Sequence, residues 1–343
     1  MDMLKQLKGN ALPSIWRRPR QAIALGAALL LLAVLYLYKP HYRHIPGASP
    51  PYTQYQDHPP AVVDVVTPPP QTGSLVAEKI WQIFFPQDGA AEQYVANPEL
   101  RDTATWIGMN SGYQYRLVGR QWSDDYVEKY FAHDKSLLDT YRSLTQHGLK
   151  SDILRYLLLS REGGVYTDID TISLKPVDLW VPERYHRDAR VVVGIEFDRL
   201  NGSGWVEIPH DLQFCQWTIA AAPGHPLFRD MVDRAVQSLN ELAGLHNTTL
   251  ASLQPTNFET VNSTGPAAWT DVVFEHLQRA DPQITNLMDM SGLAEPRLVG
   301  DILVLPIDGF GMGQAHSGAT NDGSIPDGAM LKHLFRGSWR GST

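Results

Sequence analysis

The sequence predicts an α/β fold, a mixed and mostly parallel sheet covered by helices, preceded by a single membrane-spanning helix. From about residue 79 onward, short apolar segments typical of buried strands alternate with longer segments that have helical spacing. Near the N-terminus an uninterrupted apolar run has the character of a membrane span. The chain has 343 residues, of which 43% are hydrophobic, and this is enough for one large packed domain.

The first predicted element is the membrane-spanning helix, Ala22–Tyr38, whose 17 residues would extend about 25 Å as a helix. Basic residues are more frequent before this run than after it, so the positive-inside rule places residues 1–21 in the cytosol. A cleaved signal peptide is the alternative, but the run is long and ends in bulky side chains, which favours an uncleaved signal-anchor. Its shortness suits the thinner membranes of the early secretory route.

Residues 39–74 follow as a predicted stalk, since they hold nine prolines and show no periodic apolar pattern. Residues 75–343 then form the lumenal domain. Its strands are predicted at 79–85, 103–108, 165–170, 191–197 and 302–305. Its helices are predicted at 123–131, 134–144, 152–162, 211–221, 225–243 and 267–280. Ser151 is the expected N-cap of the 152–162 helix, and Gly163-Gly164 are expected to end it.

Composition excludes several classes of protein. The formal charge of −8, from 29 basic and 37 acidic residues, argues against a nucleic-acid partner. The single cysteine, Cys215, excludes an internal disulfide and a cysteine-rich zinc site. Three N-x-[ST] sequons, at Asn201, Asn247 and Asn262, are candidate glycosylation sites if the domain is lumenal.

The residues that carry chemistry concentrate between Ser151 and Pro176. Asp168 and Asp170 stand two apart at the end of an apolar strand, so the pleat would point both to one side and Ile169 into the core. Two carboxylates at the carboxyl end of a strand suit Mg²⁺ or Mn²⁺ bound together with diphosphate oxygens. For an isolated D-x-D, a pair of solvated acids is the alternative.

The segment before the two acids favours the metal-binding interpretation. Asp152 and Arg155 are three residues apart and therefore neighbours on one helical face, where an ordinary surface ion pair is the alternative. Gly163-Gly164 allow a tight reversal, after which the strand would deliver Tyr166 and both acids. Carboxylates, a guanidinium and a phenol in one helix–turn–strand unit are groups that a sugar nucleotide requires.

These motifs, D-x-x-R, G-G-x-Y and D-x-D in this order, resemble the sugar-nucleotide signature of glycosyltransferase family 32 and its GT-A-fold relatives. The resemblance extends from Glu78 to Arg340 and is similar above all to the fungal initiation-specific α-1,6-mannosyltransferases of the Golgi. Flanking segments that resemble the family are Lys79–Gln82, Ala222–Pro226, 264–270, Leu305-Pro306 and Lys332–Trp339. The resemblance implies a GT-A-type, Rossmann-like domain.

The resemblance also implies a function. It implies a retaining hexosyltransferase that uses Mn²⁺ (or Mg²⁺) and a nucleotide sugar, GDP-mannose, to extend a mannose-rich N-glycan through an α-1,6 linkage. It implies a single-pass type II protein of the Golgi membrane, in a complex with other Golgi mannosyltransferases. Asp170 would bind the metal and Asp168 would support the metal or the ribose, which makes both catalytic. The donor-binding residues would be Trp81, Gln82, Asp152, Arg155, Gly164, Tyr166 and Trp339.

The sequence departs from the family at its C-terminal element, where two histidines usually precede Gly-Ser-Trp. Here the second position is Leu334, and the third metal ligand would be His333, the Ser338 hydroxyl or water. No catalytic nucleophile is identified from the sequence. The polar candidates, each with a structural role as the alternative, are Glu196, Asp198, Gln213 and Gln216.

Two rival functions fit part of the sequence. The D-x-D-x-T segment also matches a haloacid-dehalogenase-like phosphatase, with Asp168 as nucleophile and Asp170 as acid/base. That motif normally begins its domain, whereas here about 90 residues of the domain precede it, and the later acid pair is not found. A non-catalytic lumenal sugar-binding subunit is the second rival, for which Leu334 is the hint.

Overall fold

The computed structural model describes residues 75–85, 100–314 and 317–336. All the described residues belong to one compact unit of the chain. The predicted cytosolic tail, signal-anchor and stalk lie outside the described residues, and so do Ser338 and Trp339. Among the described residues, no helix is both long and apolar enough to cross a bilayer.

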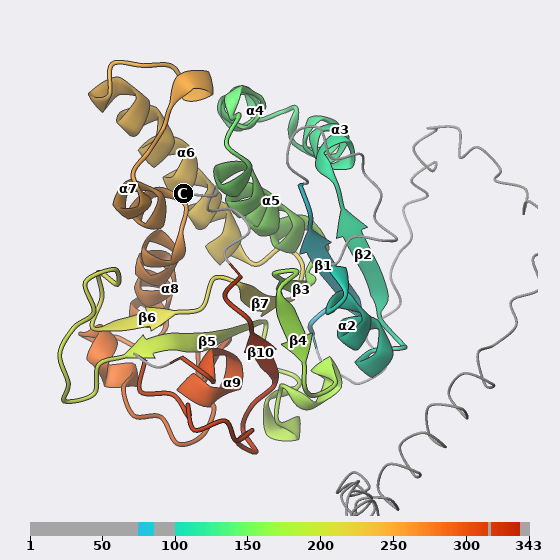
Figure 1. Cartoon of the computed structure of the whole chain (residues 1–343), viewed down its shortest axis with the longest axis vertical. Helices are drawn as coiled ribbons and strands as arrows, with labels where there is room; N and C mark the ends of the chain where they lie inside the picture. The colour runs from blue at the N-terminus through green and yellow to red at the C-terminus, as the bar shows by residue number, and fades with distance from the viewer. Residues whose placement is uncertain (1–74, 86–99, 315–316, 337–343) are drawn as a thin grey trace, which may run out of the picture. The chain divides into compact units, whose positions relative to one another are not determined.

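The described part of the chain is built on an eight-stranded sheet with the order β2-β1-β3-β7-β5-β9-β8, while β6 pairs with β5 beside this path (Figure 1). The strands are β1 (Lys79–Ile83), β2 (Gln114–Val118), β3 (Gly164–Thr167), β5 (Val191–Asp198), β6 (Leu212–Phe214), β7 (Thr218–Ala221), β8 (Arg297–Val299) and β9 (Ile302–Leu305). Pairing makes β2, β1, β3, β5 and β9 run in one direction and β6, β7 and β8 in the other. The predicted mixed, mostly parallel α/β sheet is therefore confirmed.

A second sheet of two strands joins distant parts of the chain. In it β4 (Thr171–Ser173) pairs antiparallel with β10 (Leu331–His333), so that His333 lies opposite Thr171. Because β4 follows β3 after a short turn, this pairing brings the C-terminal part of the domain to the carboxyl end of β3.

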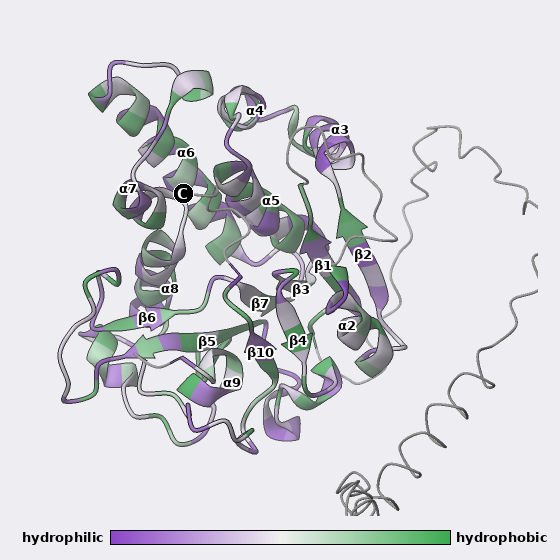
Figure 2. Ribbon diagram, viewed as in Figure 1, coloured by the Kyte–Doolittle hydropathy of each residue, from purple (hydrophilic) through white to green (hydrophobic). Residues whose placement is uncertain are grey.

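Helices cover both faces of the large sheet. They are α2 (Thr103–Met109), α3 (Arg120–Phe131), α4 (Lys135–Ser143), α5 (His147–Glu162), α6 (Pro226–Leu245), α7 (Asn257–Ser263), α8 (Pro266–Ala280) and α9 (Ile307–Gly311). Along β3, Tyr166 joins the core cluster that includes α5, α6 and α8. Its neighbour Val165 joins the other cluster, with Trp106 of α2 and Phe310 of α9. Figure 2 shows both hydrophobic and hydrophilic residues along α6, which packs by one face, whereas residues 152–159 of α5 are all buried, so this helix is covered on all sides.

The reversal between α5 and β3 requires glycine, as predicted. Gly163 and Gly164 have φ of 62° and 93°, a region that residues with a side chain rarely adopt. A Cβ on Gly164 would lie 2.6 Å from the carbonyl oxygen of Lys79 in the neighbouring strand β1. The prediction that Ser151 caps this helix is wrong, because α5 begins a turn earlier, after Gln146, where the buried Leu149 already packs into the core.

Two further predictions are wrong. Residues 103–108 form helix α2 rather than a strand, and the buried Trp106 on that helix donates its indole N–H to Thr171. Residues 211–221 form β6 and β7 rather than a helix, since Phe214 and Cys215 enter opposite core clusters, as alternation along an extended chain requires. The buried Cys215 is a free thiol, as expected. The strand predicted at 302–305 is present with those bounds, and the other predicted strands and helices are present with shifted ends.

Candidate active site

The two acids of the D-x-D motif lie in the turn between β3 and β4, not on the pleat of a strand as predicted. Three hydrogen bonds to the Asp168 backbone hold this turn. Asp168 N–H donates to the Trp217 carbonyl at 2.9 Å, while the Asp168 carbonyl accepts from the Thr171 hydroxyl at 2.6 Å and from Gln82 Nε2 at 3.0 Å. Ile169 between the acids is buried, as expected, against Phe84 and Leu100. The turn brings an oxygen of each carboxylate within 4.8 Å of the other.

Asp168, Asp170 and His333 form the cluster that fits a metal ion. Ligand atoms of these three residues all lie within 4.8 Å of one another. His333 comes from β10, and its Nε2 is 3.1 Å from Asp170 Oδ1, while Asp170 Oδ2 accepts from the Arg336 backbone N–H at 2.9 Å. Two carboxylates and an imidazole are a donor set that Mn²⁺ accepts readily. The predicted metal residues are thus brought together, and His333 reaches the site although Leu334 follows it.

The two acids differ in their electrostatic surroundings. Burial raises the pKa of Asp168 and the nearby charge of Asp170 raises it further, against the opposing effect of Arg155. Burial also acts to raise the pKa of Asp170, but the hydrogen bond and charge of His333 and the Arg336 N–H outweigh it, so this pKa is lowered. A divalent cation between the carboxylates would relieve their mutual repulsion.

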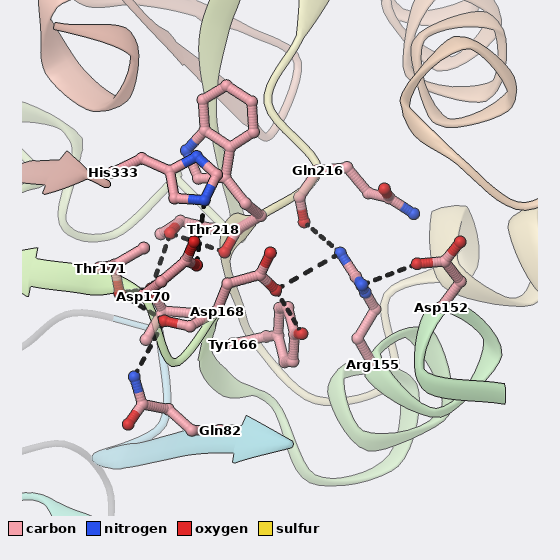
Figure 3. A network of polar contacts seen from close by, with 12 residues as sticks. Gln82, Asp152, Arg155, Tyr166, Asp168, Asp170, Thr171, Gln216, Thr218 and His333 are labelled. Carbon is pink, nitrogen blue, oxygen red and sulfur yellow. Dashed lines mark hydrogen bonds and ion pairs between the residues drawn. The ribbon is translucent and has the colours of Figure 1, made fainter. Parts of the chain in front are cut away.

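Arg155 links the D-x-x-R motif of α5 to the acid turn (Figure 3). Its Nη2 donates to Asp152 Oδ1 at 2.7 Å, and its Nη1 donates to the Gln216 carbonyl at 3.1 Å and lies 3.8 Å from Asp168 Oδ1. The guanidinium stands over the Tyr166 ring, 4.6 Å from its centroid, and the Tyr166 hydroxyl donates to Asp168 Oδ1 at 2.6 Å. The predicted convergence of these groups is present, and the ion pair is buried rather than on the surface.

Asp152 is held on its other side by a residue far along the chain. Its Oδ2 accepts from the Thr264 hydroxyl at 2.7 Å, and Gln216 Nε2 donates to the Thr264 carbonyl at 2.8 Å. Burial raises the pKa of Asp152 to about 6, although the Arg155 charge opposes the shift. Arg155 Nε is buried without a hydrogen-bond partner among the described residues, which leaves one donor of the guanidinium for a ligand.

Two predicted donor-binding residues, Trp81 and Gln82, have structural partners, and a third, Gly164, lies away from the acids. Trp81 is 3% exposed, packs on Trp122 and donates its indole N–H to the Gly163 carbonyl. Gln82 is fully buried and positions the Asp168 backbone. Gly164 stands at the amino end of β3, at the opposite end of that strand from the acids, so the structure does not bring it to the site. Donor contacts by Trp81 and Gln82 remain predictions.

Sequence reasoning missed two contributors to the site. The Trp217 ring lies 4.6 Å from the His333 ring, and hydroxyls of Thr167 and Thr218 form a buried chain with Thr171 behind the acid turn. The alternation of apolar residues through 212–221 is the signal that would have placed Trp217 and Thr218 at the start of a strand.

The candidate nucleophiles separate into two kinds. Asp198 accepts from Leu200 N–H, Ser291 hydroxyl and Gly292 N–H, and Gln216 is bonded to Tyr156 and Thr264, so both hold structure together. Glu196 and Gln213 are bonded to each other. Of the sequons, Asn201 and Asn247 are exposed, whereas Asn262 is half-buried in α7.

Comparisons with known proteins find relatives of this chain. Residues 98–186 match the family described as glycosyltransferase sugar-binding region containing DXD motif. The chain is 35% identical over 247 residues to an initiation-specific α-1,6-mannosyltransferase of Schizosaccharomyces pombe, covering 70% of this chain and 60% of that relative's length. It is 32% identical over 285 residues to an initiation-specific α-1,6-mannosyltransferase of Candida albicans, covering 77% and 72% of the two chains. The solved PaToxG glycosyltransferase structure superposes with a TM-score of 0.40 and 16% identity over 61% of this chain and 73% of that one.

Proposed function

Because the chain belongs to the family of hexosyltransferases that includes the fungal initiation-specific α-1,6-mannosyltransferases, we propose that it transfers mannose from GDP-mannose to a mannose-containing N-glycan. The linkage formed is α-1,6, with retention of configuration, and the domain is of the GT-A type. The observation that carries the proposal is the cluster of Asp168, Asp170 and His333 beside the buried Arg155–Asp152 pair.

The cluster has the properties that a nucleotide-sugar site needs. Asp168, Asp170 and His333 would hold a divalent cation, Mn²⁺ or Mg²⁺, which when bound offsets negative charge on the departing diphosphate. Tyr166 orients Asp168 through its hydroxyl, and Arg155 presents a permanent positive charge whose Nε is free for a ligand oxygen. The carboxylate of Asp152 retains lone pairs for a hydroxyl of the donor sugar.

The reaction needs few proton movements from these residues. The acceptor oxygen forms a bond to the anomeric carbon, the bond from that carbon to the diphosphate oxygen breaks, and the hydroxyl proton passes to a phosphate oxygen. Arg155 and the Asp152 carboxylate orient the donor during this exchange, because their own ion pair is already made and needs no rearrangement.

The cellular setting is part of the proposal. The apolar run 22–38, with basic residues before it, supports a single-pass type II protein of the Golgi membrane whose catalytic domain is lumenal. In that compartment its partners are the nucleotide sugar, the mannose-rich glycoprotein acceptor and other Golgi mannosyltransferases. Immunofluorescence of the tagged full-length protein, with protease protection of each terminus in isolated vesicles, tests the location and the topology.

A donor screen of the purified full-length protein tests the activity. GDP-mannose, GDP-glucose and UDP-glucose are supplied with Mn²⁺, Mg²⁺ or EDTA, and release of nucleoside diphosphate and transfer to α-linked mannotriose are measured. We expect turnover of GDP-mannose that EDTA abolishes and added Mn²⁺ restores. Turnover of UDP-glucose alone would refute the donor, and hydrolysis of p-nitrophenyl phosphate in place of any donor would favour the phosphatase.

Substitution of Asp170, compared with the same change at an exposed aspartate, tests the metal assignment. Asp170→Asn preserves the side-chain shape and an acceptor for the Arg336 N–H, so the domain stays folded while turnover falls by at least about 100-fold. Asp188→Asn makes the same change at an exposed position and leaves turnover intact. Full activity of the Asp170 variant would contradict the metal assignment, and donor binding without turnover by the wild type would favour the non-catalytic subunit.

A further inference from the structure

A second pair of polar residues, Glu196 and Gln213, lies at the same edge of the sheet as the acid turn. Strands β3 and β5 both pair antiparallel with β7, and Gly164 and Val191 both lie opposite Ala221. Asp168 is four residues beyond Gly164, and Glu196 is five residues beyond Val191. Both acids are therefore at the carboxyl ends of their strands, with backbones roughly 10 Å apart at about 4.8 Å per strand.

Residues 215–217, between β6 and β7, form hydrogen bonds both to β5 and to the acid turn. Cys215 N–H donates to the Gly194 carbonyl of β5 at 2.8 Å, and two residues later the Trp217 carbonyl accepts from Asp168 N–H at 2.9 Å. At this level the chain between the ends of β3 and β5 is the segment that leads from β6, paired with β5 at Ile195, Phe197 and Asp198, to the start of β7 at Thr218. A sugar bound at the acid turn would thus have the Glu196 region as its neighbour.

The Glu196–Gln213 pair has hydrogen-bonding capacity that the described residues do not use. Gln213 Nε2 donates to Glu196 Oε2 at 3.0 Å, and within the described part of the chain this is the single hydrogen bond that the Glu196 side chain makes. Gln213 is 1% exposed, yet its Oε1 has no partner among the described residues. Buried polar atoms are ordinarily satisfied, so an unpaired oxygen of this kind points to a ligand.

The charge of the Glu196–Gln213 pair limits the chemical class of the ligand that it can bind. Glu196 is half-buried and forms no ion pair with the described residues, and burial raises its pKa to about 7 against the effect of Gln213. A carboxylate without a cation would repel the diphosphate of the donor but accepts hydrogen bonds from neutral hydroxyl groups. Asp198, two residues on, accepts three hydrogen bonds, from the Leu200 N–H, the Ser291 hydroxyl and the Gly292 N–H, and so holds its own loop together.

We propose that Glu196 and Gln213 form the acceptor subsite, in which their oxygens accept hydrogen bonds from hydroxyl groups of the sugar that receives the transferred mannose. The inference rests on the proposed function, because it assumes that the acid turn binds the donor. It assigns the two residues to recognition of a neutral polyol and adds no covalent step to the reaction.

The inference is tested by measuring, with the full-length protein, the ratio of mannose transfer to donor hydrolysis. Hydrolysis of GDP-mannose in Mn²⁺ requires the donor site alone, whereas transfer to α-linked mannotriose requires both sites. For Glu196→Ala we expect the transfer-to-hydrolysis ratio to fall about tenfold or more, with a raised KM for mannotriose and an unchanged KM for GDP-mannose. Glu196→Gln should recover part of the loss, and Gln213→Met should share it.

The controls separate the possible failures. Glu241→Ala, at an exposed position of α6, should leave the ratio at the wild-type value. An unchanged ratio in Glu196→Ala, or an equal loss of transfer and hydrolysis with a lower melting temperature, would overturn the acceptor subsite while leaving the proposed function in place. Absence of both reactions in the wild-type protein would overturn the proposed function itself.

Discussion

Replacement of Arg155 by lysine tests whether the site needs a planar guanidinium or merely a positive charge. Arg155 donates to Asp152 Oδ1 at 2.7 Å and to the Gln216 carbonyl at 3.1 Å, and it covers the Tyr166 ring at 4.6 Å. A lysine ammonium at the end of a flexible chain reaches one of these partners and does not stack flat on the ring. The substitution therefore keeps the charge and removes the geometry.

The expected size of the effect follows from the interactions that lysine cannot make. One charge-assisted hydrogen bond contributes about 1.5–3 kcal/mol, and the buried cation–π interaction contributes about 1 kcal/mol. If the transition state depends on this geometry, a loss of about 2.5–4 kcal/mol corresponds to a decrease in kcat/KM of about 70- to 900-fold. Because Asp152 is left less well paired in the core, the melting temperature should also fall.

Two measurements on purified full-length protein decide the outcome. Donor hydrolysis with GDP-mannose and Mn²⁺ gives kcat/KM, and thermal unfolding followed by circular dichroism gives the melting temperature. The matched control is Arg142→Lys, an exposed arginine paired with Glu128 at 2.6 Å, where neither quantity should change. Wild-type kcat/KM together with an unchanged melting temperature in Arg155→Lys would refute the reasoning.

Three further predictions concern the fold and its modification. Gly164→Ala should lower the unfolding free energy by about 3 kcal/mol or more in urea titration, because φ is 93° and the added Cβ would lie 2.6 Å from the Lys79 oxygen; a loss below about 1 kcal/mol would contradict this. Asp134 caps α4, and the Leu137 N–H and Arg229 lower its pKa, so Asp134→Ala should cost about 1 kcal/mol near neutral pH. This cost should disappear as the pH falls below about 4, since a lowered native pKa contributes stability only while the carboxylate is ionised; a constant difference down to about pH 2 would be inconsistent with it. Glycopeptide mapping after expression in yeast should find glycans at Asn201 and Asn247 and none at Asn262, whose Nδ2 donates to the Phe258 carbonyl within α7; an occupied Asn262 would contradict this.

The order of motifs in the sequence predicted much of the site because those residues interact over short distances along the chain. Asp152 and Arg155 are one turn apart on α5, and Gly163-Gly164 force the reversal that returns Tyr166 and Asp168 beside them. Such neighbours meet whenever the local element forms, so their spacing alone predicts the contact. The strand–helix alternation predicted the α/β class for the same reason.

Prediction failed where tertiary packing outweighs local preference. Residues 103–108 are rich in residues common in strands, yet Trp106 is buried as part of a helix whose indole bonds to Thr171. Residues 211–221 were expected to be helical, and pairing with β5 and β3 makes them strands. Propensity is a weak guide when partners come from elsewhere in the chain.

By itself, then, the sequence determined the fold class, the Gly-Gly reversal and the acid and arginine motifs, because each depends on residues a few positions apart. The tertiary structure alone decided that His333 completes the acid cluster and that the Thr264 hydroxyl donates to Asp152. It also decided that Glu196 lies at the same edge of the sheet as the acid turn. His333 and Thr264 lie more than 100 residues from the groups they join. Contacts of this kind follow from strand pairing and core packing of the whole domain, which no local pattern records.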